Sequence, residues 1–565
     1  MSIPASSATV TTALAALVAD GTVDEVEAGV AEVLLRLTGE TRAALARPVA
    51  LAVAAPRRGD VCLDLATDEG AAMAEVVALL ESSPTVRVAA GYDEDGRGPA
   101  RPLVLRGGRL YLDRFDRAEG RVASALTELA SRTVEVDADR LERALDRLLP
   151  EDAPGAHAQR SAARSAATRG LTVLTGGPGT GKTTTVARLL AVLLLASGAE
   201  DAPRIALAAP TGRAAARLTE AVLGSLGPMD VEPWVVERLR DAPGRTLHRL
   251  LGWRAGSPSR FLHDAARPLP FDVVVVDEAS MVPIARYADL LAALAPTARL
   301  VVVGDRDQLA AVEAGNVLAD LVVASDQDVP TGVVELRHAF RFPASGAIGA
   351  TAALLRTSGT DAARLRAGLA AADPSEGEVV LVPPLDPTSA ADPFGLGLPS
   401  GVSERIVAAF VDLARRAQDD EDPAELLRAV DRLRLLVPLR VGPEGADELD
   451  RRIARAVERR APDEVPGPDG RVLPLGRPIM VTRNDPAIDL YNGDVGVVVR
   501  DPSRPDDPAR RRIAFPGVDG VRTVPPARVP AHRTVHAATV HRSQGAQFDE
   551  VVLVLPRIDH PLVTR

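Results

Sequence analysis

Lys182 is the only lysine among the 66 lysine and arginine residues of this 565-residue chain. It lies in the stretch LTVLTGGPGTGKTTTVARLLAVLLLAS, residues 171–197, within the frame Gly176-x-x-x-x-Gly181-Lys182-Thr183. An ammonium group is a compact point charge and a guanidinium group is a wide planar fork, so only lysine fits a narrow cradle of phosphate oxygens. The frame is that of a phosphate-binding loop, and the single lysine therefore predicts binding of a nucleoside triphosphate.

Such a loop needs a strand before it and a helix after it. GLTVLT reads as a short β-branched strand, and TTTVARLLAVLLLA has the apolar spacing of a helix. Backbone N–H groups of the loop and the N-terminus of the helix would hold phosphate oxygens. Lys182 would reach the β- and γ-phosphates of ATP, and Thr183 would bind Mg²⁺. The expected ATP-binding residues of this loop are Gly176, Gly177, Pro178, Gly179, Thr180, Gly181, Lys182, Thr183 and Thr184.

An acidic pair, Asp277 and Glu278, ends the apolar strand FDVVVVDEAS. In doubly wound sheets, ligands bind at the carboxyl edge, so this pair would lie near the phosphate loop. Asp277 would hold Mg²⁺ through water, and Glu278 would polarise the attacking water. Two ordinary acids at a solvated strand end are the alternative. Together with the phosphate loop, the pair predicts an NTPase.

Length and composition limit the class of protein. A chain of 565 residues divides into roughly three or four domains. The formal net charge of -11 argues against a basic coat for nucleic acid but leaves room for a narrow basic channel. Cys62 is the only cysteine, which excludes an internal disulfide and fits a reducing cytosol. No secretion signal or membrane helix is recognised, so a cytoplasmic protein without membrane contact is expected.

The pattern of apolar residues along the sequence changes at about residue 171. Before it, TTALAALVADG and VDEVEAGVAEVLLRLTGETRAALA predict helices, and VALAVAAP and RPLVLRGGRLYLDR predict short strands. After it, apolar runs such as RIALAAP, FDVVVVDEAS and ARLVVVGD alternate with helices, which predicts a buried parallel sheet. GRPIMVTRNDPAIDLYNGDVGVVVRD and RRIAFPGVDGVRTVPP predict the hairpins of a small inserted β-barrel.

Five further motifs narrow the function of the expected NTPase. They are AAPTGRAAARL at 208–218, TLHRLLG at 246–252, VVVGDRDQLAAVEAGNVL at 301–318, RHAFRFPASGAI at 337–348 and ATVHRSQGAQFDEVVLVLP at 538–556. Their ordered series resembles the superfamily 1 helicases and, within them, the RecD family, the α subunits of RecBCD-type exodeoxyribonuclease V. The resemblance runs from about residue 158 to 556. GDVCLDL and RPLVLRGGRLYLDR resemble the N-terminal domain of the same family.

The resemblance implies roles for individual residues. Gln159 matches the glutamine that reads the adenine edge, with a surface glutamine as the alternative. Gln308 matches the residue that senses the γ-phosphate, and Arg341 matches an arginine that contacts it, so that Lys182, Glu278, Gln308 and Arg341 form the expected catalytic set. The implied DNA-binding residues are Thr211, Gly212, Arg213, His248, Arg249, His541, Ser543 and Gln544. For each of these taken singly, a plain surface or capping role is the alternative.

The resemblance also implies the architecture. The expected fold class is α/β, with two RecA-like P-loop NTPase domains, the second incomplete, an inserted small β-barrel and an N-terminal α+β domain. The expected divisions are a partner-docking domain at 1–110, a helical linker at 111–157, motor domain 1 at 158–345, the start of motor domain 2 at 346–475, an SH3-like inserted β subdomain at 476–535 and the continuation of motor domain 2 at 536–565.

The implied function is an ATP-dependent 5′ to 3′ DNA helicase or translocase subunit acting in double-strand break repair and recombination. Its implied partners are single-stranded and end-containing double-stranded DNA and RecB-like and RecC-like subunits in a heterotrimer. A stand-alone helicase and a nucleotide-binding regulatory subunit with little turnover are the alternatives. Gln547 replaces a family glutamate assigned to ribose. The last family motif would lie beyond Arg565, so slow turnover by the chain alone is expected.

Overall fold

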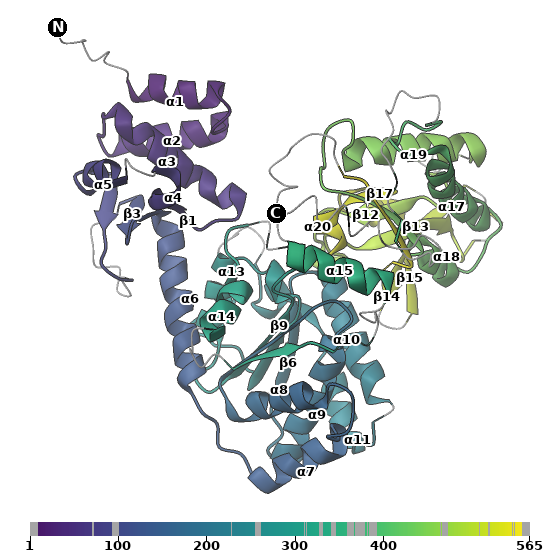
Figure 1. The fold of residues 1–565 in the computed structure, drawn as a ribbon. Coiled ribbons are helices and arrows are strands. Elements are labelled where there is room, and N and C mark those ends of the chain that lie inside the picture. The colour runs from purple at the N-terminus through teal and green to yellow at the C-terminus, as the bar shows by residue number, and fades with distance from the viewer. Residues whose placement is uncertain are drawn as a thin grey trace. The chain divides into compact units, whose positions relative to one another are not determined.

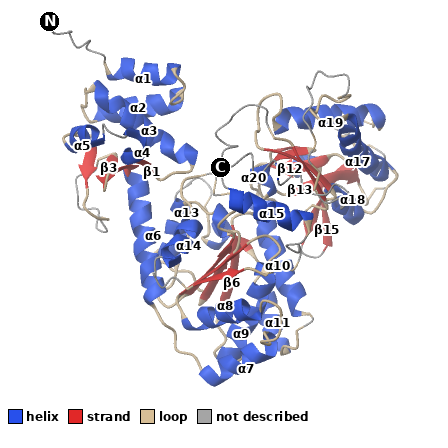
Figure 2. Ribbon diagram, viewed as in Figure 1, coloured by secondary structure: helices blue, strands red, loops and turns tan. Residues whose placement is uncertain are grey.

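The fold is known from a computed structural model (Figures 1 and 2). It describes residues 9–555 except 70–72, 93–100, 228, 255–260, 310, 312, 327–331, 339, 341–345, 359–366, 368–378, 381, 383–391, 464, 466–472, 505, 508, 518–519, 545 and 547. The chain divides into two compact units. The first comprises Met1–Pro210, Ala221–Pro243 and Leu247–His338, and the second comprises Thr211–Glu220, Gly244–Thr246 and Ala339–Arg565.

The N-terminal part of the first unit packs helices against a four-stranded sheet of order β1-β4-β3-β2. Its strands are β1 (Cys62–Asp64), β2 (Val86–Val88), β3 (Leu103–Arg106) and β4 (Arg109–Leu112). Its helices are α1 (Val10–Ala19), α2 (Glu25–Leu37), α3 (Ala46–Ala54), α4 (Leu65–Glu69), α5 (Met73–Glu81) and the long α6 (Asp113–Ser131). The RPLVLRGGRLYLDR hairpin is present as β3 and β4, with Gly107 and Gly108 turning at φ of 54° and 77°.

One expected strand is a helix. VALAVAAP, predicted as a strand, forms most of α3 and the 3-10 turn that follows it. A short run of Ala, Val and Leu that is apolar on every side has no period that separates a buried strand from a buried helix. Alanine is the best helix former, and seven of the nine residues of α3 are buried, so packing on all sides selects the helix.

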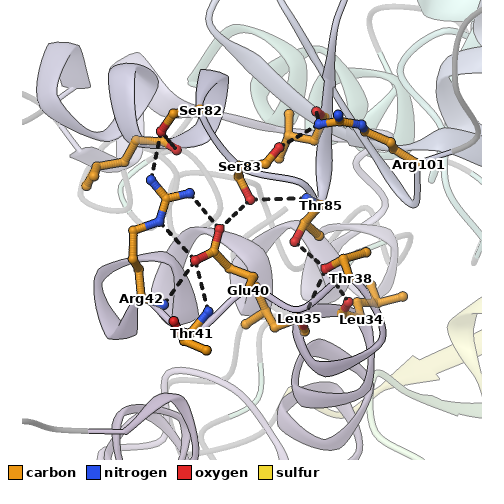
Figure 3. Close-up of polar contacts among 12 residues, drawn as sticks. Leu34, Leu35, Thr38, Glu40, Thr41, Arg42, Ser82, Ser83, Thr85 and Arg101 are labelled. Carbon is orange, nitrogen blue, oxygen red and sulfur yellow. Dashed lines mark hydrogen bonds and ion pairs between the residues drawn. The ribbon is translucent and has the colours of Figure 1, made fainter.

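A buried carboxylate joins the helices of this part to its sheet (Figure 3). Glu40 accepts hydrogen bonds from Nε of Arg42 at 2.9 Å, from Nη2 of Arg42 at 2.6 Å and from Oγ of Ser83 at 2.7 Å. These bonds lower the pKa of Glu40 to about 2, with the Arg42 side chain as the largest cause. Arg101 donates to the carbonyl oxygens of Ser83 and Val86 at 2.7 Å each. The loop before β2 is thereby fixed to the turn after α2.

A six-stranded sheet of order β10-β5-β9-β8-β6-β7 carries the phosphate loop. Its strands are β5 (Leu171–Gly176), β6 (Ile205–Ala209), β7 (Arg245–Thr246), β8 (Val273–Val276), β9 (Arg299–Gly304) and β10 (Val333–Leu336). The helices of this region are α7 (Ala138–Leu148), α8 (Ala156–Thr168), α9 (Lys182–Ser197), α10 (Gly212–Leu226), α11 (Pro233–Arg240), α12 (Leu247–Leu250), α13 (Ile284–Ala293) and α14 (Val317–Asp326). Apolar side chains of α6, α13 and α14 share one core with β5, β8 and β9, while α7, α8 and α9 pack together beside β5.

The second unit holds two further sheets. Three parallel strands in the order β17-β11-β18 are β11 (Leu433–Val437), β17 (Ala537–Thr539) and β18 (Glu550–Leu553). Five antiparallel strands in the order β15-β14-β13-β12-β16 are β12 (Pro478–Val481), β13 (Val495–Arg500), β14 (Arg511–Gly517), β15 (Gly520–Val524) and β16 (His532–Thr534). The helices are α15 (Ala347–Ser358), α17 (Ser400–Gln418), α18 (Pro423–Val430), α19 (Ala446–Arg460) and α20 (Val540–Ser543).

The expected mixed α/β fold with parallel sheets is therefore confirmed. The two expected hairpins of the insertion are present as the antiparallel pairs β12–β13 and β14–β15. Closure of these strands into a barrel stays a prediction, as do the expected domain boundaries. Within the part of the chain that the structure describes, no helix has both the length and the apolar composition needed to cross a membrane.

Candidate functional site

Three strand ends of the first unit meet at one edge of its parallel sheet. The order β5-β9-β8 places the strand before the phosphate loop beside β9, and β9 beside the strand that ends at the acidic pair. Thr175 pairs with Gly304, and Val276 pairs with Val302, so the three strands end at nearly the same height. Loops at the carboxyl ends of parallel strands form the ligand site of such sheets. The register thus collects the phosphate loop, Asp277 and the GDRDQ segment.

The phosphate loop depends on glycine where its backbone turns or packs closely. Gly179 and Gly181 have φ of 74° and 78°, which β-carbon-bearing residues adopt only at a cost. A Cβ on Gly176 would lie 2.7 Å from the carbonyl oxygen of Leu336 and 2.8 Å from Oγ1 of Thr180. Thr180 is buried and donates a hydrogen bond to the carbonyl oxygen of Gly177 at 2.8 Å. The loop is therefore shaped before any ligand arrives.

Lys182 is the first residue of α9 and folds back over its own loop. Its Nζ donates to the carbonyl oxygens of Gly176 at 2.6 Å and Gly177 at 3.0 Å. Thr183 is half-buried and Thr184 is exposed in the same first turn, where helical N–H groups lack intrahelical partners. Thr185, one residue further, is buried, and its Oγ1 donates to the carbonyl oxygen of Gly181 at 2.9 Å. The ammonium group and the helix N-terminus are groups that can bind an anion, and Thr183 lies beside them.

The acidic pair lies on a strained turn. Asp277 is buried, and its Oδ1 accepts a hydrogen bond from the backbone N–H of Glu278 at 2.8 Å. Glu278 has φ of 50° and ψ of 41°, the left-handed region that costs a non-glycine residue about 1–2 kcal/mol. Strain of this kind is retained where the surrounding structure fixes a functional group.

Asp305 is a site residue that the sequence motifs did not single out. It follows β9 directly and is buried, and burial raises its pKa while the positive charge of Lys182 opposes that rise. Gln308, the residue expected to sense the γ-phosphate, donates a long hydrogen bond of 3.5 Å from Nε2 to Oδ2 of Asp305. The feature that could have revealed Asp305 is its place immediately after the glycine that ends a buried strand.

Gln159 is held by a partner that the motifs also did not single out. It lies buried on α8, and its Oε1 accepts a hydrogen bond of 2.8 Å from Nη1 of Arg188 on α9. A surface glutamine, the alternative for this position, is therefore wrong. The expected contact of Gln159 with adenine stays a prediction.

The expected DNA-contacting residues of the first unit lie on the short helix α12. His248 is half-buried, and its ring centroid lies 6.0 Å from that of Phe261. Burial, followed by the positive charge of Arg286, lowers the pKa of His248. A neutral imidazole at neutral pH can accept as well as donate hydrogen bonds. Arg249, next along the helix, is exposed.

The other expected DNA-contacting residues lie in the second unit, where Thr211, Arg213 and Ser543 already have hydrogen-bond partners. Thr211 precedes α10 and accepts a hydrogen bond from the N–H of Ala214 at 3.2 Å, as a helix cap does. Gly212 and Arg213 begin α10, and Nη2 of Arg213 donates to Oδ2 of Asp431 at 2.7 Å.

His541 and Ser543 lie on α20, and Gln544 follows it. Oγ of Ser543 donates to the carbonyl oxygen of Val540 at 2.7 Å, and burial lowers the pKa of His541. Arg341 and Gln547 lie outside the described residues. DNA contact by the described residues stays a prediction.

The geometry of the first unit defines a P-loop NTPase: a parallel sheet with Lys182 after one strand and Asp277 after another. Residues 159–314 match the AAA domain family. The chain is 42% identical over 543 residues to the "RecBCD enzyme subunit RecD" of Mycolicibacterium smegmatis, covering 95% of this chain and 89% of that protein. It is 39% identical over 586 residues to the Mycobacterium tuberculosis protein of the same name, covering 96% and 88%. The chain belongs to the RecD family of RecBCD-type DNA helicase subunits.

More distant similarities were also found. The chain is 29% identical over 459 residues to the "ATP-dependent RecD2 DNA helicase" of Deinococcus radiodurans, covering 81% of this chain and 53% of that protein. A crystal structure of Bacteroides Pif1 bound to ssDNA matches with 16% identity and a TM-score of 0.33, covering 73% of this chain and 89% of that one.

Proposed function

We propose that this chain hydrolyses ATP to move 5′ to 3′ along single-stranded DNA, as the helicase subunit of a RecBCD-type complex in double-strand break repair and recombination. The observation that carries the proposal is the shared edge of β5, β9 and β8, where Lys182, Gln308 and the acidic pair come together. In this proposal, the two parallel sheets of the chain belong to two RecA-like motor domains, and the five antiparallel strands form an SH3-like barrel. The polarity follows from family membership, and the cytoplasm is the proposed place of action.

Binding of ATP begins with an exchange of hydrogen bonds at Lys182. Its Nζ leaves the carbonyl oxygens of Gly176 and Gly177 and donates to the β- and γ-phosphates, which carry full negative charge. The N-terminus of α9 adds unpaired N–H groups and the positive end of the helix dipole. The loop keeps its shape during this exchange, because Thr180 and the two left-handed glycines fix it.

The residues present also fit Mg²⁺. Thr183 offers a hydroxyl in the first turn of α9, and Asp277 offers a buried carboxylate at the end of β8, and hard oxygen ligands of this kind suit Mg²⁺. When bound, the ion neutralises charge on the transferring phosphoryl group. Glu278, whose backbone is fixed in the left-handed region, orients the attacking water and accepts its proton.

The same sheet edge offers a route from hydrolysis to DNA. Gln308 senses the γ-phosphate and is bonded to Asp305, whose charge is coupled to Lys182. We propose that Arg341 contacts the γ-phosphate and that residues of α10, α12 and α20 contact the strand, because their sequence motifs resemble those of the family. Alternate gripping by these contacts advances the strand.

The N-terminal part of the chain offers a surface for a partner subunit. Val26, Val30, Val33 and Leu37 of α2 are 73%, 42%, 41% and 76% exposed. Their spacing of four, three and four residues puts them on one face of the helix. Ala28, Ala31 and Leu35 of the same helix are buried in the core, so α2 is apolar on two faces. An exposed apolar stripe of this kind is typical of a protein interface, and we assign it to docking of RecC-like or RecB-like chains.

The test is a single-stranded-DNA-stimulated ATPase and unwinding assay on the full chain, alone and co-expressed with RecB-like and RecC-like chains. Stimulated hydrolysis, unwinding from a 5′ tail and co-purification of the partners are expected. Unwinding with no partner retained would instead indicate the stand-alone helicase. Nucleotide binding without turnover in the complex would indicate a regulatory subunit and contradict the proposed function.

A further inference from the structure

A second parallel sheet edge, in the second unit, collects arginines to which no role has been assigned; of these, Arg542 lies within the motif ATVHRSQGAQFDEVVLVLP. Strands β11 and β17 are parallel neighbours, and Val437 pairs with Thr539 at their carboxyl ends. Arg440 lies three residues beyond the first of these ends, and Arg542 lies three residues beyond the second. Because both loops leave the same edge, the two arginines are brought side by side. Ligands of parallel sheets bind at this kind of edge.

A third arginine and one carboxylate complete the cluster. Nε of Arg440 donates to Oδ2 of Asp447 at 3.3 Å, and Nη1 of Arg533 on β16 donates to Oδ1 of the same carboxylate. The pKa of Arg542 is lowered, first by desolvation and then by the positive charges of Arg533 and Arg440, while Asp447 opposes that change. Three guanidinium groups therefore act on one another around a single carboxylate.

The charge of this cluster is not balanced by its own contacts. Arg533 has buried Nε and Nη2 atoms without a hydrogen-bond partner among the described residues. By contrast, Arg451 and Arg452 on the adjacent helix α19 both bind Glu448. This local excess of positive charge contrasts with the net charge of -11 of the whole chain. Donors that are fixed, positive and incompletely paired are suited to an anionic ligand with several oxygen atoms.

On the basis of the proposed function, we infer that Arg440, Arg533 and Arg542 form a subsite for the phosphate backbone of single-stranded DNA. Arg542 lies on α20 between His541 and Ser543, which are expected to contact the strand. The cluster offers only guanidinium groups as donors, and their charge-assisted, bidentate bonds suit phosphate oxygens. We therefore assign its contacts to the backbone, where binding is independent of sequence. Asp447 holds Arg440 and Arg533 together until the strand replaces it.

The test measures binding of the full chain to a fluorescent oligo-dT at several salt concentrations. For single strands, the slope of log affinity against log salt falls by about 0.7 for each phosphate that is no longer neutralised. Arg440→Gln and Arg542→Gln should each lower affinity and reduce the slope by about 0.7, and Arg542→Lys should keep the slope. Asp447→Asn should strengthen binding, because it removes the competing carboxylate. A damaged fold would not produce changes in opposite directions.

Arg428→Gln is the matched control, since Arg428 is an exposed arginine on α18 that pairs with Glu425 one turn away. It should leave both affinity and slope unchanged. If the unmodified chain binds DNA but both glutamine variants keep its slope, this subsite is wrong and the proposed function stands. If the unmodified chain fails to bind oligo-dT, the proposed function and the subsite are both contradicted.

Discussion

Arg188 donates a hydrogen bond of 2.8 Å to Oε1 of Gln159, from the helix after the phosphate loop to the helix before it. Arginine has donors only, so the amide oxygen of Gln159 must face Arg188. The amide nitrogen is then the group that Gln159 can offer to a nucleobase. Nitrogen N7 accepts such a bond in adenine and in guanine alike, so this contact distinguishes purines poorly.

The first prediction is that Gln159→Ala affects ATP and GTP equally. Loss of one hydrogen bond of about 1 kcal/mol should raise KM roughly fivefold for each nucleotide. The measurement is DNA-stimulated hydrolysis of the two nucleotides. Arg164→Gln is the control, because Arg164 lies on the same helix but pairs with Glu142 at the surface. A loss confined to ATP would show that the amide reads the adenine amino group and that Arg188 does not set its orientation.

The second prediction concerns Lys182. Lys182→Gln should reduce hydrolysis by at least about 10²-fold, because a neutral amide cannot offset charge on the transferring phosphoryl group. Lys182→Arg should fail as badly, since the ammonium lies within 3.0 Å of two carbonyl oxygens of the loop and a guanidinium fork is wider. ATP turnover by both variants in the complex is the measurement. Near-normal turnover by the arginine variant would contradict this explanation of the only lysine.

The third prediction separates stability from activity at Glu278. Glu278→Gly and Glu278→Ala should both lose hydrolysis by about 10²-fold or more, because each removes the carboxylate. The glycine variant should be about 1 kcal/mol more stable than the alanine variant, since only glycine adopts φ of 50° without strain. Denaturant unfolding of the two variants checks this. Equal stabilities would show that the turn after β8 stores no backbone strain.

The sequence predicted those parts of the fold that a short run of residues determines by itself. Runs such as VVVV at 273–276 are β-branched throughout and end at polar residues, so strand type, burial and the position of the site all followed from them. The glycines and Lys182 of the phosphate loop were also predictable, because all the residues of the loop lie in one short segment of the sequence.

Features that depend on distant partners were not predictable. Arg188 and Gln159 are 29 residues apart, and only the packing of α8 on α9 makes them neighbours. The cluster of Arg440, Arg533 and Arg542 depends on the register of β11 with β17 and on the return of the insertion through β16. VALAVAAP forms a helix, and not the predicted strand, because its surroundings bury it on all sides.

The fourth prediction is a pH dependence set by Glu40. Its pKa falls from 4.5 to about 2 in the folded chain, so the carboxylate stabilises the fold fully above about pH 4.5 and this contribution is lost as pH falls toward 2. Glu40→Gln should lower the free energy of unfolding by about 2 kcal/mol at neutral pH. It should also weaken the loss of stability between about pH 4.5 and pH 2. Hydrogen exchange of the amides of α2 and β2 in the full chain measures it. Glu25→Gln, at an exposed position of α2, is the control. An unchanged loss of stability below pH 4.5 in the Glu40 variant would contradict the assignment.

The last prediction tests the apolar stripe of α2 as the docking surface. Val30→Asp combined with Leu37→Asp should release this chain from its RecB-like and RecC-like partners, because a carboxylate cannot be buried in an apolar interface without a counter-charge. Both residues are exposed, so the fold and the DNA-stimulated ATPase of the chain alone should be unchanged. Co-purification and ATPase activity are measured together. Val323→Asp is the control, since Val323 on α14 is 55% exposed but lies outside α2, and it should leave assembly intact. Full assembly of the double variant would place the partner on another surface of the chain.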